Sequence, residues 1–148
     1  MADLMDTVRQ LQAAIGRRDR AAILALVAPD LEYHYHVGSK PLHGVEKFGK
    51  FLDGYFAQMQ DVDWKIERWA QNGDVLMTEG YEQYTDAQSG QRLTNRYMGS
   101  MEFRDGKIAK WRDYFQKGPV PGTGPGAAAA GSASGSGTGS GDRGATTG

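Results

Sequence analysis

Three turn signals divide the second half of the chain into strand-length segments. Asn72-Gly73, Ser89-Gly90 and Asp105-Gly106 each combine a turn-forming residue with glycine, which tolerates the backbone of tight turns. Between these turns apolar and polar residues alternate, as on strands with one buried face. The sequence therefore predicts four consecutive antiparallel strands, over about residues 62–66, 75–84, 92–103 and 108–115.

The first half predicts three helices and one strand. Apolar residues recur at helical spacing over residues 4–15, 19–27 and 45–59. Asp19 is a plausible cap of the second helix, and Pro29 is expected to end it. Residues 31–37 alternate like a strand. Helices followed by an antiparallel meander predict an α+β domain, in which a curved antiparallel sheet wraps around three helices as a cone with a pocket at its wide end.

All fifteen aromatic residues (3 Trp, 7 Tyr and 5 Phe) lie before residue 118. Residues 1–117 have the size of one ordinary domain. Residues 118–148 are rich in Gly, Ser, Ala and Pro and contain one Asp and one Arg. Such a segment cannot bury enough apolar surface to offset its ordering entropy, so we predict a disordered tail.

Charge and composition exclude several classes of partner. The formal net charge is −1 without a basic run, which disfavours nucleic acid. No cysteine is available for a disulfide or a thiolate metal site. No apolar run approaches membrane length, and the start resembles no secretory signal, so we expect no membrane contact and a cytoplasmic location.

The segment Trp111-Arg112-Asp113-Tyr114-Phe115 places a carboxylate between two large aromatic residues. Strand alternation puts Trp111, Asp113 and Phe115 on one face. Burying a charge is costly, so Asp113 needs a partner or a function. The alternative is that Asp113 only accepts a hydrogen bond from a backbone amide or a tyrosine hydroxyl.

The same alternation brings further polar groups to the face of Asp113. Glu82 shares a face with Gly80, and the matching faces of neighbouring strands carry the residues Tyr33, Tyr35, Asn95 and Tyr97. This is a mostly apolar cavity with few polar groups, as in small-molecule sites. Two carboxylates there repel, so one is expected to take a proton, as acid–base chemistry requires. The alternative is a Glu82 that leans to the rim and is solvated.

The opposite faces carry a different set of residues. His34 and His36 resemble a metal pair, but without a third ligand a half-exposed pair is the better interpretation. Arg96 and Arg112 are also expected to point away from the pocket. The outer face is apolar enough to suggest a sheet-on-sheet homodimer, although a strand-rich core would also explain its four residues. They are Met77, Tyr81, Met98 and Tyr114.

This order of elements resembles the superfamily of ketosteroid isomerase, SnoaL-type polyketide cyclases, limonene-epoxide hydrolase and nuclear transport factor 2. Residues 37–44 (VGSKPLHG) look like the loop after the first strand of ketosteroid isomerases. Residues 106–115 look like the closing strand of limonene-epoxide hydrolases. The resemblance covers nearly all of residues 1–117 and implies the same cone-shaped fold.

The isomerase residues implied by the resemblance are missing. Tyr35, followed by His36, occupies the place of the general base, Leu11 that of the oxyanion tyrosine, and Gly99 that of the protonated aspartate. A steroid-isomerase mechanism is therefore not implied.

The epoxide-hydrolase residues are partly present. In that resemblance Asp113 matches the aspartate that activates water, and Tyr33 matches the tyrosine that holds it. Tyr35 stands in the asparagine position and Glu82 in that of the acid aspartate. Gly80 replaces the bridging arginine, which puts the family's own route to epoxide hydrolysis in doubt.

Two functions remain open at the level of the sequence. One is a cofactor-free enzyme acting on an apolar organic molecule by epoxide hydrolysis, hydration or dehydration, or isomerisation or cyclisation. Asp113 would be its base, Glu82 its acid, and Tyr33 and Tyr35 would orient water or substrate. The wall would come from Trp111, Tyr97, Asn95 and Phe115. The other is a non-catalytic ligand-binding or dimeric scaffold domain. No Gly-rich phosphate loop or metal cluster implies a cofactor.

Overall fold

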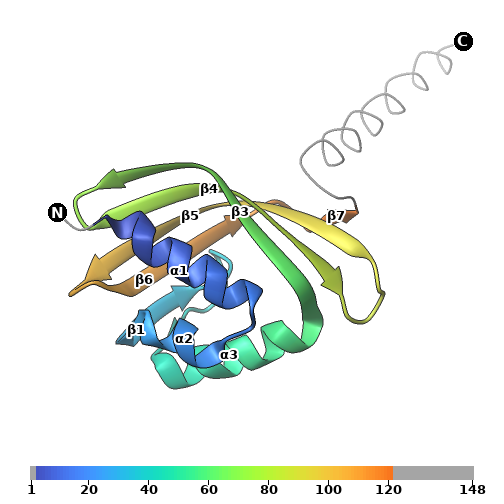
Figure 1. Ribbon diagram of the computed structural model, residues 1–148, viewed down its shortest axis with the longest axis horizontal. Coiled ribbons are helices and arrows are strands. Elements are labelled where there is room, and N and C mark those ends of the chain that lie inside the picture. Colours follow the sequence, from blue (N-terminus) through green and yellow to red (C-terminus); the bar gives the residue numbers. More distant parts are fainter. Residues whose placement is uncertain (1–2, 122–148) are drawn as a thin grey trace, which may run out of the picture.

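The computed structural model describes residues 3–121, and its three helices lie against one face of a curved sheet (Figure 1). Helix α1 (Leu4–Gly16) is capped by the Asp3 carboxylate, which accepts a hydrogen bond from the Met5 amide. Helix α2 (Arg20–Ala25) is capped by Asp19, and helix α3 (Val45–Gln58) follows Gly44. The apolar sides of the helices pack onto the concave face of the sheet.

The sheet has seven strands in the order β2-β1-β6-β5-β4-β3, with β7 paired to β5. The strands are β1 (Val27–His34), β2 (Leu42–His43), β3 (Met59–Asn72), β4 (Val75–Asp86), β5 (Arg92–Arg104), β6 (Lys107–Phe115) and β7 (Val120–Pro121). Strands β3 to β6 form the predicted antiparallel meander. Two irregularities interrupt β3, between residues 60 and 63 and between 66 and 68. Bulges bend a strand, and β3 accordingly arches over the helices.

The first strand differs from the prediction. Helix α2 ends at Ala25, so Pro29 lies inside β1 and does not terminate a helix. It falls in the irregular stretch between Val27 and Glu32, where a residue without an amide hydrogen is tolerated. Strand β1 runs parallel to β6, so the sheet is not purely antiparallel. The chain after His34 stays beside β6, because the Val37 amide donates to the Asp113 carbonyl over 2.9 Å.

The predicted tail begins with an ordered segment. Val120 and Pro121 form β7, opposite Thr94 and Leu93, so residues 118–121 extend the domain predicted to end at Lys117. The rest of the predicted tail, from residue 122, lies outside the described residues.

The outer face of the sheet carries large apolar side chains in water. Met77, Met98 and Tyr114 are each more than half exposed, and Met98 lies directly opposite Tyr114. Tyr81 is half-buried beneath the Arg96 guanidinium, 5.9 Å from its ring centre. These four residues form an outer strip on the face opposite the helices, and Glu79 interrupts it between Met77 and Tyr81.

We predict that this strip joins two copies of the chain, because burial of such a patch is favourable. Sedimentation at micromolar concentration should give a dimer, and Met98→Lys, at the centre of the strip, should give a monomer with unchanged circular dichroism. A wild-type chain that sediments as a monomer at high micromolar concentration contradicts the prediction.

Candidate functional site

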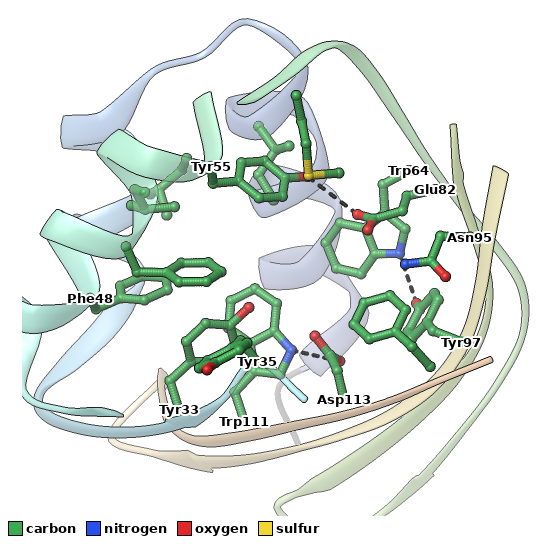
Figure 2. Close-up of a pocket in the computed structure, with 16 residues that line it drawn as sticks. Tyr33, Tyr35, Phe48, Tyr55, Trp64, Glu82, Asn95, Tyr97, Trp111 and Asp113 are labelled. Carbon is green, nitrogen blue, oxygen red and sulfur yellow. Dashed lines mark hydrogen bonds between the residues drawn. The ribbon is translucent and has the colours of Figure 1, made fainter. Parts of the chain in front are cut away.

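A pocket of about 160 Å³ lies between α3 and the concave face of the sheet. Figure 2 shows Phe48 and Tyr55 facing the sheet residues Tyr97 and Asp113 across it. All eight residues predicted to form the site line it: Asp113, Glu82, Tyr33, Tyr35, Trp111, Tyr97, Asn95 and Phe115. Their convergence follows from the alternation of side chains along four neighbouring strands.

Asp113 lies buried at the sheet side of the pocket, between Trp111 and Phe115 on β6. The Trp111 Nε1–H group donates a 3.1 Å hydrogen bond to Asp113 Oδ1. Gly99 faces Asp113 on β5, and a Cβ atom there would approach Oδ1 to 2.6 Å, so the absence of a side chain makes room for the carboxyl. Burial raises the pKa of Asp113 well above its usual range, against the hydrogen bond from Trp111.

Glu82 reaches the same pocket from β4. The Tyr55 hydroxyl on α3 donates to Glu82 Oε2 over 3.2 Å. Burial raises the pKa of Glu82 to about 7, although hydrogen bonds from Tyr55 and Asn95 act in the opposite direction. The Glu82 side chain is therefore partly buried and hydrogen-bonded inside the pocket, in contrast to the alternative of a solvated side chain at the rim.

The two carboxyl groups face one cavity from separate places on the sheet. Asp113 pairs with Gly99, which pairs with Thr78, whereas Glu82 lies four residues further along β4. In a flat sheet this offset would separate their Cα atoms by roughly 16 Å. The curvature brings the side chains nearer, and the charge of Glu82 contributes to the raised pKa of Asp113. The two carboxyl groups therefore line the same cavity at different positions along it.

A hydrogen-bonded triad fixes the wall between the carboxyl groups. Trp64 Nε1 donates to the Tyr97 hydroxyl over 2.7 Å (Figure 2). The same hydroxyl lies 2.9 Å from Thr78 Oγ1. Neither Trp64 nor Tyr55 was among the site residues predicted from the sequence. Side-chain alternation on β3 and the apolar face of α3 predict that Trp64 and Tyr55 point inward. The bend of β3, which the sequence did not predict, brings Trp64 over the pocket.

The two tyrosines of the β1 region differ in burial. Tyr33 is buried, with its ring centre 5.0 Å from Phe48 and 4.8 Å from Trp111. Burial raises the pKa of Tyr33 well above its usual range, so its hydroxyl stays protonated and can donate. Tyr35 is 37% exposed at the mouth of the pocket and stacks on Phe51 at 5.4 Å.

The packing around Gly80 leaves no room for the arginine that the resemblance to epoxide hydrolases implies at this position. A Cβ atom at Gly80 would overlap the Lys65 carbonyl oxygen of β3. Arginine could enter only if β3 moved away, which would withdraw Trp64. Arg96 and Arg112 pair with Glu67 and Glu102, so both are engaged outside the pocket, as predicted.

The histidines do not join the site. His34 Nε2 lies 2.6 Å from Glu32 Oε1 on the other face of β1, and His36 is exposed. Within residues 3–121 no group of three or more His, Cys, Asp or Glu side chains is placed to hold a metal ion. No helix in the described part of the chain is long and apolar enough to cross a membrane.

Comparisons with known proteins agree on one family and one fold. Residues 8–111 match the profile of the SnoaL-like domain. No curated protein sequence matches the chain significantly. An LEH-like epoxide hydrolase from M. tuberculosis is 25% identical, with a TM-score of 0.67, over 76% of this chain and 82% of that one.

Two further solved structures carry small molecules. A protein of ketosteroid isomerase-like fold from Catenulispora acidiphila, in complex with trimethylamine, is 19% identical, with a TM-score of 0.68, over 75% of this chain and 85% of that one. TerC, co-crystallised with polyporic acid, is 20% identical, with a TM-score of 0.66, over 76% and 91%. These two likenesses concern the fold alone.

Gly80→Ala should destabilise the domain by at least about 2 kcal/mol, because the added Cβ overlaps backbone that cannot yield cheaply. Gly54→Ala is the control: it lies in α3 with no atom near its Cβ position and should gain about 0.5–1 kcal/mol. Urea unfolding of both variants measures the difference. An equal effect at the two positions would show that β3 does not press on Gly80.

The raised pKa of Glu82 should appear in the pH dependence of stability. Between the ordinary value of 4.5 and about 7 the folded chain binds more protons at Glu82 than the unfolded chain does. The free energy of unfolding contributed by this group therefore falls as the pH rises through that window. Glu82→Gln removes the cost of ionising this carboxyl in the folded chain. The free energy of unfolding of the variant, relative to that of the wild type, should therefore rise by about 2 kcal/mol from pH ~4.5 to pH ~7. Urea unfolding at several pH values measures this; a constant difference would place Glu82 in water.

Proposed function

The chain belongs to the family of SnoaL-like domains, and we propose that it is an enzyme that uses two carboxyl groups as general acid and base on a small, largely apolar molecule. This membership confirms the superfamily that the closing strand and the order of elements predicted from the sequence. The similar solved structures include an epoxide hydrolase. One observation carries the proposal. Asp113 and Glu82 face a single aromatic-lined pocket, and both have raised pKa values.

The volume of the pocket limits the substrate. An apolar cavity of about 150 Å³ holds a benzene molecule, and this pocket measures about 160 Å³. The proposed substrate is therefore about one ring in size. Epoxide hydrolysis, hydration or dehydration, and isomerisation or cyclisation each require that one proton be removed and another delivered. Two carboxyl groups at separate places along the cavity suit that requirement.

The electrostatics favour a division of roles opposite to the one taken from the resemblance. When the two carboxyl groups together hold one proton, that proton lies on Asp113, because Asp113 is the more deeply buried of the two. Glu82, whose pKa is about 7, is then free to accept a proton near neutral pH. We therefore assign Glu82 as the base toward water or a substrate C–H, and Asp113 as the acid toward a substrate oxygen.

The neighbouring residues complete the proposed mechanism. Trp111 orients Asp113, and Asn95 and Tyr55 orient Glu82. Tyr33, which stays protonated, can donate to the substrate oxygen, while Tyr35 closes the mouth. The Tyr97 ring, fixed by Trp64 and Thr78, and the Phe115 ring form the wall.

The role assignment predicts a ranking of two variants on one-ring epoxides such as styrene oxide or cyclohexene oxide. Glu82→Gln removes the base and should lower kcat/KM by about 10²-fold or more. Asp113→Asn should lose less, because its amide can still donate a hydrogen bond to the substrate oxygen. Steady-state kinetics of purified variants measures both, with circular dichroism to check folding. The reverse ranking returns the base role to Asp113, and full activity of both variants overturns the proposal.

The second candidate function is a ligand-binding domain without turnover. Gly80 favours it, because the arginine that bridges the carboxylates in the epoxide hydrolases has no place beside Lys65. Binding of one-ring compounds without conversion of epoxides or cyclic enones would select this function.

A further inference from the structure

The pocket contains acidic groups with no positive charge to balance them. Of the described residues that line it, Asp113 and Glu82 are acidic and none is Lys, Arg or His. Arg96 and Arg112, on β5 and β6, are held by Glu67 and Glu102 instead. An ionised Glu82 would repel a ligand that carries a carboxylate or phosphate, whereas it would attract a positive charge.

Asn95 is the polar neighbour of Glu82 on β5. Asn95 Oδ1 is buried and has no hydrogen-bond partner among the described residues. The side chain of Asn95 already donates to Glu82, whose carboxyl also accepts from Tyr55. A buried acceptor without a donor is costly. The protein encloses this oxygen, so it is the Glu82 carboxyl and not the Asn95 oxygen that a ligand in the pocket can contact.

Aromatic faces surround the same space. Tyr33, Tyr55, Trp64 and Trp111 line the cavity together with Phe51, and the two indole rings stack nearly parallel at 6.3 Å. The negative faces of such rings attract cations, and aromatic cages are a recurrent means of binding ammonium groups. Rings and acids together therefore form a cavity suited to positive charge on an apolar body.

We propose that the ligand of this pocket is a small organic cation, an ammonium group carried on about one ring, held between the aromatic faces and Glu82. The inference deepens the proposed function and rests on it, since it assigns the substrate class of the same site. The two carboxyl groups would then act on an amine-bearing substrate, with its ammonium group and its reacting C–H beside Glu82 and its oxygen toward Asp113.

Three probes that share one ring and differ in charge test the proposal on the wild-type chain: benzylammonium, benzyl alcohol and benzoate. Calorimetry at about pH 8, where Glu82 is ionised, should give benzylammonium at least about tenfold tighter binding than benzyl alcohol and no binding of benzoate. Glu82→Gln should abolish the preference for benzylammonium while benzyl alcohol binds as before. Glu79→Gln, on the outer face of the same strand, is the matched control and should keep the preference.

Equal or tighter binding of benzyl alcohol by the wild type overturns the cation proposal, as does binding of benzoate or of none of the three probes. The comparison needs no variant, so a failure of Glu82→Gln to fold would not affect it. The acid–base function is judged separately, by turnover of uncharged epoxides. A chain that converts epoxides but shows no charge preference therefore retains the proposed function and loses this inference.

Discussion

The close approach of β3 to β4 at Gly80 underlies the rest of the site. The Lys65 carbonyl occupies the space of a side chain at Gly80, and this contact is possible only because residue 80 has none. Irregularities on either side of this stretch bend β3 toward the helices. The bend brings Trp64 over the cavity, where it stacks near Trp111 and fixes the Tyr97 hydroxyl. The aromatic wall therefore depends on a glycine that contributes no chemistry itself.

The same contact determines the electrostatics of the pocket. An arginine in place of Gly80 would supply the positive charge that the two carboxyl groups of the pocket lack, and the backbone of β3 leaves no room for it. Without that charge, burial raises the pKa of both Asp113 and Glu82. The packing at Gly80 therefore affects the pKa of Glu82, two residues along the same strand, and that of Asp113 on β6. The proposed acid–base function and the proposed cationic ligand both rest on this missing charge.

A second glycine, Gly99, determines the space around the Asp113 carboxyl. Gly99 leaves room for the Asp113 carboxyl, which a Cβ atom would approach to 2.6 Å. From the sequence, Gly99 was noted only as the position where the resemblance to ketosteroid isomerases implies an aspartate. In this chain its small size lets Asp113 turn inward beside Trp111, which donates the hydrogen bond that orients it.

Side-chain alternation was enough to predict the meander and which residues share a face, because the period of a strand is a local property. All eight predicted pocket residues line one cavity for that reason. Sequence reasoning misplaced β1 by treating Pro29 as a helix end, since it could not show that an irregular pairing with β6 tolerates a proline. It also missed the parallel β1–β6 pair, β2, β7 and the place of Trp64. These depend on contacts between segments far apart in the chain, and so do the protonation states, because burial and the absence of a nearby cation exist only once the sheet has closed over the helices.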